Sequence, residues 1–254
     1  MCKEENIMDN YNIDSHKLMY HPKEVGNWLV GNLIQPIYME VSPSGACNHR
    51  CKFCALDYLS YKPNMLDVSN YVKFITQQDG LKSIMFGGEG EPLMHQHFTD
   101  IVAATFTRGI DCALTTNGVL LTPQRSEIVK MMKWIKISVD AGTADTYHKV
   151  HGTSTRDWQT LWRNIEHLVK IKDKCKIGLQ FLLLKGNLDD VFNFLYDAVT
   201  AEVDYVVIKL YSQHNKSFNK GQIIDLDNIL YDEIQSWKLD NFKVIIRTDK
   251  SERS

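Results

Sequence analysis

The sequence predicts an α/β fold built on a parallel sheet. Short apolar strands alternate with helices six times between residues 36 and 209, and this pattern is typical of parallel strands joined by helical crossovers. The chain has 254 residues, 44% of them hydrophobic and 24% charged, which is ordinary for a globular protein with a sizeable core. Polar clusters follow several strands, at the end where barrels and open sheets gather catalytic groups. The spacing alone allows either a barrel or a flat doubly wound sheet.

The elements follow one another along most of the chain. Strands are expected at 36–41, 82–86, 110–115, 134–139, 176–184 and 205–209, and helices at 22–30, 68–77, 96–108, 123–133, 158–169 and 189–200. Asp67 and Thr122 are candidate helix N-caps. A polar loop at 212–222, a helix at 226–237 and a last strand at 242–247 follow. We therefore expect a flexible arm over residues 1–21, a core over residues 22–211 and a helix–strand segment over residues 212–254.

The most distinctive stretch is a cysteine loop directly after the first strand. Cys47, Cys51 and Cys54 have the spacing C-x3-C-x2-C and follow the turn-prone residues 43–45. Thiolates are soft ligands that suit iron–sulfur clusters or zinc, and three of them leave one metal position open for chemistry. A zinc site that adds His49 or a distant ligand is an alternative. A redox pair of Cys51 and Cys54 is a weaker one, because it leaves Cys47 unexplained.

This spacing, with Phe53 before the last cysteine, resembles the signature of the radical S-adenosylmethionine (SAM) enzymes. The resemblance implies that Cys47, Cys51 and Cys54 hold a [4Fe-4S] cluster whose open iron binds SAM. It implies reductive cleavage of SAM to a 5′-deoxyadenosyl radical that abstracts hydrogen from a small-molecule or peptide substrate. An electron donor such as flavodoxin or ferredoxin is also implied. The implied fold is a partial (β/α)6 TIM-like barrel of parallel strands with flanking helices.

Later motifs follow in the family's order and extend the resemblance over residues 36 to 211. The loop 87–92 is similar to a motif that binds the amino group of SAM, although Glu89 stands where the family usually has Gly. The resemblance assigns cofactor contacts to Gly90, Glu91, Asn117, Ser138, Asp140, Gln180, Lys209, Tyr211 and Phe53, the last on the adenine face. Taken alone, the loop 87–92 and residues 117–118 are also common turns, and Asp140 also suits a helix cap. Phe53 also suits the core.

Two departures from the family pattern are visible. His151 stands where many members have an Arg that faces the SAM carboxylate, so we expect that contact to be weakened or moved. His148 and His151, like His95 and His97, are expected to be ordinary surface histidines. The motif wording favours the branch whose members carry SPASM or twitch extensions with further cluster cysteines, yet no cysteine follows Cys175. The extension is therefore absent, on another polypeptide, or outside this sequence.

Net charge and hydropathy restrict the remaining classes of protein to which the chain can belong. The net charge of −2 gives no basic excess for nucleic acid, and no apolar run approaches the ~20 residues that span a bilayer. The polar N-terminus does not resemble a signal peptide, so a cytoplasmic protein is expected. Cys112 and Cys175 are expected to be small core residues. Two other functions stay open: an activating enzyme for a glycyl-radical partner, which the wording of the loop 87–92 disfavours, and a non-catalytic zinc-stabilised binding protein.

Overall fold

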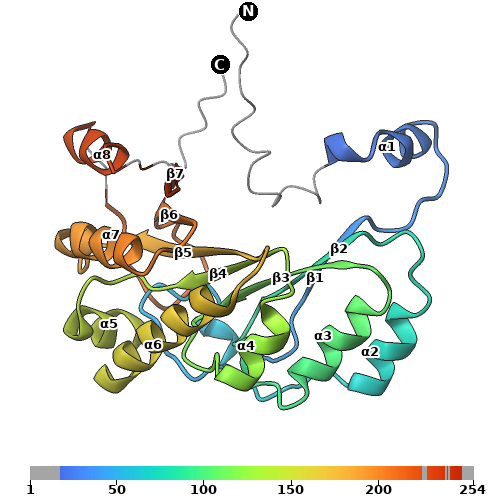
Figure 1. The fold of residues 1–254 in the computed structure, drawn as a ribbon, viewed down its shortest axis with the longest axis horizontal. Coiled ribbons are helices and arrows are strands. Elements are labelled where there is room, and N and C mark those ends of the chain that lie inside the picture. Colours follow the sequence, from blue (N-terminus) through green and yellow to red (C-terminus); the bar gives the residue numbers. More distant parts are fainter. Residues whose placement is uncertain (1–17, 225–227, 238, 240, 248–254) are drawn as a thin grey trace, which may run out of the picture.

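One parallel sheet runs through the whole fold (Figure 1). The computed structural model describes residues 18–224, 228–237, 239 and 241–247. In this part of the chain the strands lie in sequence order, each parallel to the next. They are β1 (Tyr38–Val41), β2 (Ser83–Phe86), β3 (Asp111–Thr116), β4 (Trp134–Ser138), β5 (Lys176–Leu183), β6 (Tyr205–Leu210) and β7 (Lys243–Arg247). All six predicted core strands are confirmed.

The seventh strand is the main difference from the expected topology. The last predicted strand joins the same sheet as β7, parallel to β6, with Tyr205 opposite Lys243 and Lys209 opposite Arg247. The sheet thus has one strand more than the six β/α units predict. The long polar loop after β6 has no periodicity, so nothing in the sequence indicates that the predicted strand 242–247 pairs with β6. Val244 is buried and anchors the strand in the core.

The helices decide between the two predicted architectures. They are α1 (Pro22–Leu29), α2 (Val68–Ile75), α3 (Phe98–Phe106), α4 (Pro123–Val129), α5 (Ala144–His151), α6 (Thr155–Ile171), α7 (Val191–Thr200) and α8 (Asn228–Gln235). Helices α2 to α7 gather on one side of the sheet (Figure 1), whereas a doubly wound sheet carries helices on both faces. The fold is therefore a partial, open barrel, as the family resemblance implies.

Local sequence signals explain where several helices begin. Asp67 accepts a hydrogen bond from Asn70 N, and Thr122 from Arg125 N, so both predicted N-caps are confirmed. Helix α5 begins after a different cap from the one considered: Thr143, not Asp140, accepts from the first turn. A cap bond typically stabilises a helix by about 1 kcal/mol.

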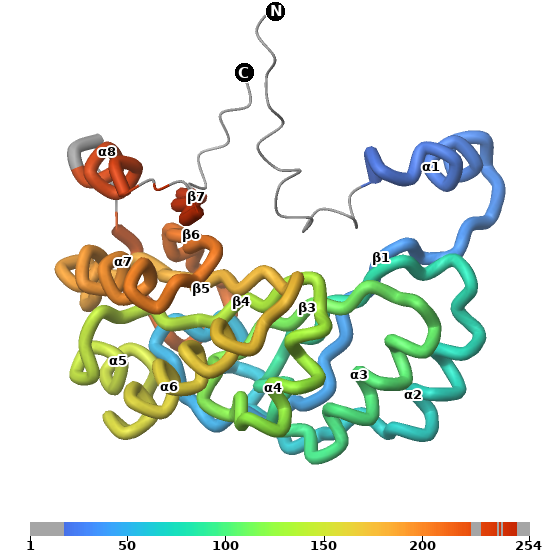
Figure 2. Tube along the Cα trace, in the orientation of Figure 1, coloured from blue at the N-terminus to red at the C-terminus, as the bar shows by residue number. Residues whose placement is uncertain are grey.

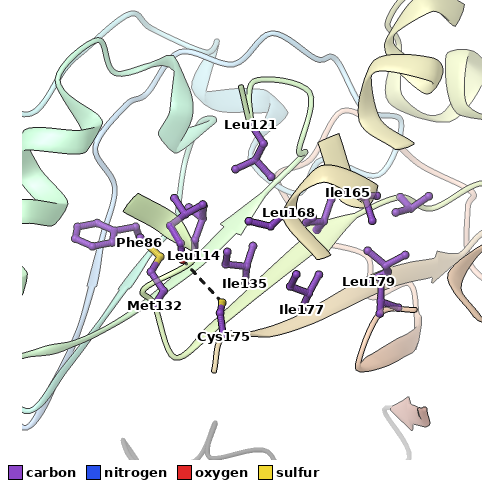
Figure 3. Packing of buried hydrophobic residues seen from close by; sticks show 14 of the residues in the cluster. Phe86, Leu114, Leu121, Met132, Ile135, Ile165, Leu168, Cys175, Ile177 and Leu179 are labelled. Carbon is purple, nitrogen blue, oxygen red and sulfur yellow. Dashed lines mark hydrogen bonds between the residues drawn. The ribbon is translucent and has the colours of Figure 1, made fainter. Parts of the chain in front are cut away.

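The hydrophobic core lies between the sheet and these helices (Figure 3). Leu114, Ile135, Ile177 and Leu179 from the strands meet Ile165 and Leu168 of α6. Along β4, Ile135 and Ile137 are fully buried, whereas Trp134, Lys136 and Ser138 on the opposite face are half-buried. Burying each large apolar side chain contributes about 1.5–3 kcal/mol. The helix side is therefore closed by apolar packing, and the inner face of the barrel carries the polar groups. Cys112 and Cys175 are core residues, as predicted.

The N-terminal segment stands apart from this core. Helix α1 projects away from the sheet (Figure 2), and Trp28 and Leu29 are exposed. Most of the predicted arm, residues 1–17, lies outside the described residues, as do Cys2, the start of the predicted helix 226–237 and the last residues, 248–254. None of the described helices has the length and apolar character that a bilayer crossing requires.

Candidate active site

The cysteine loop is held against the end of helix α5. Arg50 N donates to His151 O at 2.9 Å, and Lys52 N donates to Val150 O at 2.8 Å. Gly152 follows the helix with φ +58°, and any Cβ there would collide with Arg50 O. Only glycine therefore meets both the left-handed backbone and the close approach. The loop carrying Cys47, Cys51 and Cys54 thus has a fixed position at the carboxyl rim of the strands.

His151 lies beneath the cysteine loop and contacts one of its thiols. The residue is 1% exposed, its Nδ1 is 3.3 Å from Cys51 Sγ, and its Nε2 is 2.9 Å from Val139 O. A carbonyl only accepts, so Nε2 carries the proton of the neutral ring, and the Cys51 thiol donates to Nδ1. Burial, with a contribution from His49, lowers the pKa of His151 to about 3, so the ring is neutral near pH 7.

The expectation of surface histidines is therefore wrong for His151 and correct for His148, which is exposed. It is also wrong for His95, which is buried with Nε2 2.9 Å from Leu66 O, and correct for exposed His97. In both wrong cases the burial comes from a segment distant in sequence, which packs over the ring. The local amphipathic pattern of a helix cannot predict burial by such a distant segment.

The three thiols suit a metal centre. Burial and the neighbouring thiol charges raise the pKa of Cys51 well above the ordinary value, and burial also raises that of Cys47. Three thiolates this close repel one another, so a cationic centre is needed to hold them deprotonated. The residues present therefore fit an iron–sulfur cluster. Ligand atoms of His49, Cys51 and His151 also lie within 4.8 Å of one another, so the zinc alternative has candidate ligands too.

The loop after β2 locks onto the cysteine loop. A Cβ on Gly90 would collide with Ser44 O and Ala46 O, and Glu91 N donates to Ala46 O at 2.8 Å. Because the two backbones touch here, a side chain at position 90 would push the cysteine loop outward.

Glu91 and Asn117 tie the ends of β2 and β3 together. The buried Glu91 carboxylate accepts from Thr116 Oγ1 (2.6 Å), Asn117 N (2.8 Å) and Leu93 N (3.1 Å). Burial raises the pKa of Glu91, and these hydrogen bonds oppose the rise. Asn117 Nδ2 donates to Asn48 Oδ1 at 2.7 Å, inside the cysteine loop. The structure thus brings together the predicted residues of two motifs, and the Glu91 side chain is engaged inward by protein donors.

Asp140 lies deeper than the other predicted cofactor contacts. It is fully buried, its Oδ1 accepts from Leu182 N at 2.6 Å, and its Oδ2 is 3.5 Å from His151 Nε2. Burial raises the pKa of Asp140 to about 7. Ser138 and Gln180 pair in register and are half-buried on the inner face. Ser138 and Gln180 thus face the barrel interior, whereas the carboxylate of Asp140 joins the ends of β4 and β5.

A cavity of about 400 Å³ adjoins the cysteine loop at the ends of β5 to β7. Its lining includes Phe53, Leu182, Lys209, Tyr211 and Arg247. The ring of Phe53 stands edge-on to that of His151 at 5.5 Å. Tyr211 is buried, and its hydroxyl donates to Asn219 O at 3.5 Å. Three of the predicted cofactor contacts, Phe53, Lys209 and Tyr211, therefore share one cavity.

A polar segment after β6 also fixes the cysteine loop, and sequence analysis did not predict this contact. Asp57 accepts from Phe218 N at 2.9 Å and from Asn219 N at 2.8 Å. Ser217 Oγ donates to Cys54 O at 3.2 Å, and Asn219 Nδ2 donates to Cys51 O at 3.3 Å. No periodicity or motif marks these residues, because they act through backbone contacts with a loop about 160 positions earlier.

These features define an open parallel barrel with three cysteines gathered at the carboxyl ends of its strands. The Radical SAM superfamily model matches residues 41–196, more than half of the chain. The chain therefore belongs to the radical SAM superfamily, as its motifs predict. Membership implies SAM and an iron–sulfur cluster as cofactors.

Individual relatives agree with this family. A GTP 3′,8-cyclase of Nostoc punctiforme is 31% identical over 141 residues, 51% of this chain and 42% of the relative. Streptococcus suis SuiB bound to precursor peptide SuiA has a similar fold, with a TM-score of 0.70 and 18% identity over 89% of this chain and 53% of SuiB. SuiB has also been solved bound to S-adenosylmethionine, with a TM-score of 0.70 and 17% identity over 91% of this chain and 55% of SuiB. The chain spans about half the length of the curated relatives it matches.

Proposed function

We propose that this chain is a radical SAM enzyme in which Cys47, Cys51 and Cys54 hold a [4Fe-4S] cluster and the open iron binds SAM. The observation that carries the proposal is the three-cysteine loop, fixed at the rim of an open barrel in a chain of this family. When bound, these cofactors supply a radical that removes a hydrogen atom from a substrate C–H bond. The substrate is a small molecule or a peptide, and the electron donor is a protein such as flavodoxin or ferredoxin.

The chain's own residues would bind, orient and shield the reactants. Gly90 and Glu91 keep the cysteine loop and the ends of β2 and β3 in register. Ser138 and Gln180 offer polar groups to ribose from the inner face of the barrel. Phe53 and Tyr211 provide the aromatic wall for adenine, and this wall would also exclude water.

Two kinds of substrate are supported by the names of the relatives. The curated relatives include GTP 3′,8-cyclases, which points to a small molecule. The structural neighbour SuiB was solved with a precursor peptide, which points to a peptide. The proposal therefore keeps both classes.

Metal analysis separates this proposal from the zinc alternative, which the His49, Cys51 and His151 group supports. After anaerobic reconstitution the full chain should bind about four irons and four sulfides, since one three-cysteine loop serves one cluster. Cys51→Ala should lose the iron and stop 5′-deoxyadenosine release from SAM under reducing conditions. Cys175→Ala is the matched control, because Cys175 is a core residue distant from the loop. Zinc without sulfide, or unchanged 5′-deoxyadenosine release by Cys51→Ala, would contradict the proposal.

A further inference from the structure

Three cationic side chains come from the inner face of the barrel and its rim. Lys136 is on the half-buried inner face of β4, between the helix-facing Ile135 and Ile137. Lys209 near the end of β6 and Arg247 at the end of β7 are partners in register, and both line the 400 Å³ cavity. The strands that carry them are β4, β6 and β7, so the cations converge from different parts of the chain.

The surroundings of Lys136 disfavour its positive charge. Burial and the charges of Lys209 and Arg247 lower the pKa of Lys136 to about 7, and the nearby acids Asp140 and Glu40 only partly oppose this. Within the described residues its ammonium makes no hydrogen bond or ion pair, and it lies 6.0 Å from the Trp134 ring.

The two nearby acids have other partners. Asp140 accepts from Leu182 N, and Glu40 accepts from Tyr38 OH at 2.9 Å. One oxygen of each acid therefore accepts a hydrogen bond from another donor, and neither acid lies within ion-pair distance of Lys136. Lys209 and Arg247 repel the positive charge of Lys136 more strongly than Asp140 and Glu40 attract it. An anion that entered here would relieve the repulsion and gain charge-assisted hydrogen bonds.

We propose that Lys136 and Arg247, flanked by Lys209, bind an oxyanion of the substrate, a phosphate or a carboxylate, inside the barrel. The inference rests on the proposed function and names the chemical class of its substrate. Lys209 keeps its predicted place beside the cofactor, so the inference depends on Lys136 and Arg247. The cavity joins this anion site to Phe53, so a bound substrate would lie beside the predicted adenine wall. An ammonium and a planar guanidinium together suit oxyanion recognition.

Calorimetric titration with simple anions tests the inference on the full chain with its cluster reconstituted. Inorganic phosphate and acetate are the two probes, and the tighter one identifies the oxyanion. Lys136→Met and Arg247→Gln should each weaken binding about tenfold or more, the usual effect of losing a charged hydrogen-bond partner. Lys133→Met is the matched control, since Lys133 precedes the same strand but is 42% exposed and pairs with Asp111 at 3.5 Å. The control should bind like the parent.

A pH series with sulfate, which does not titrate in this range, adds a second readout. Since the pKa of Lys136 is lowered to about 7, the charged form is lost as pH rises through that value. Sulfate affinity should therefore fall between about pH 6 and pH 8 in the parent, and much less in Lys136→Met. Lys209 and Arg247 provide the charge that remains, and Asp140 and Glu40 are the acids that face the site. The pKa of Asp140 is raised to about 7, so its charge also appears in this range in both proteins, and the difference between the two pH series is what reports on Lys136.

Several results would overturn the inference. These are no saturable anion binding by the parent, equal losses in Lys133→Met, or competition between the anion and SAM, which would assign the cations to the cofactor. Should Lys136→Met fail to fold, judged by thermal unfolding and iron content, Arg247→Gln at the exposed strand end still decides. The anion titration needs no turnover, so it can fail while Cys51→Ala still confirms the radical chemistry, and the reverse also holds.

Discussion

Asp140 joins two strand ends, and the pair Asp140→Ala and Asp140→Asn tests how. The residue has φ +52°, in the left-handed region that Asp and Asn tolerate better than Ala. Its buried Oδ1 accepts from Leu182 N at 2.6 Å. Alanine would leave that N–H unpaired, at about 1–3 kcal/mol, and add about 1–2 kcal/mol of backbone strain. We expect Asp140→Ala to lose about 2–5 kcal/mol of unfolding free energy, and Asp140→Asn to lose much less.

The two variants should also differ from the parent in pH dependence. Burial raises the pKa of Asp140 from 3.8 to about 7, so the folded chain holds the proton more tightly than the unfolded chain. The stabilisation is therefore complete below about pH 4 and is lost as pH rises through about 7. At 1.36 kcal/mol per pKa unit, the change is about 4 kcal/mol. Asparagine does not ionise, so the parent minus Asp140→Asn should show this decline.

Urea unfolding of the full chain before iron reconstitution, followed by circular dichroism from about pH 4 to about pH 8, measures both effects. His49 and His151, whose lowered pKa values raise stability with pH, act in both proteins, so the comparison uses the difference between the two profiles. The reasoning fails if Asp140→Ala is as stable as the parent. It also fails if the stability of Asp140→Asn changes with pH in the same way as that of the parent. SAM titration of reconstituted samples adds a functional result. Weaker binding by Asp140→Asn would support direct contact with the cofactor, and weakening by Ala alone would indicate a structural role.

Three further predictions follow from the same rim. Gly90→Ala should lower the iron content well below about four per chain, because the new Cβ would collide with Ser44 O and Ala46 O; full iron loading would contradict the predicted close approach. Asn117→Ala should keep its iron but bind SAM about tenfold to hundredfold more weakly, the effect of one or two lost hydrogen bonds, and calorimetry showing parental affinity would refute it. A chain that begins at Tyr20 should load iron normally, and failure to do so would show that the arm is structural.

The elements that sequence predicts well here depend on local signals. Asp67 and Thr122 cap helices because a short oxygen-bearing side chain reaches a backbone N–H within the first turn. The strands up to β6 were found because apolar runs and turn residues lie next to each other in the chain. The order of motifs at the strand ends predicted the family, since each motif is contiguous.

The residues that sequence did not predict depend on contacts between distant segments. Ser217 and Asn219 fix the cysteine loop through its carbonyls, which any residue type supplies. His151 and His148 are three positions apart on α5, yet one is buried and the other exposed, because the cysteine loop covers only one side. Lys136 resembles any strand lysine until the barrel curvature brings Lys209 and Arg247 near it. Local sequence patterns cannot predict these long-range contacts.

His151, which stands where the family has an Arg, and the interior cations together indicate where positive charge lies in this barrel. In the family pattern an Arg at this position brings a permanent charge toward the SAM carboxylate. The ring of His151 instead donates to Val139 O and faces Cys51 Sγ with its other nitrogen, so it is neutral and engaged. Permanent positive charge lies instead at the ends of β6 and β7, on Lys209 and Arg247. An anion entering this barrel would therefore be drawn toward β6 and β7, the side on which the substrate oxyanion is proposed to bind.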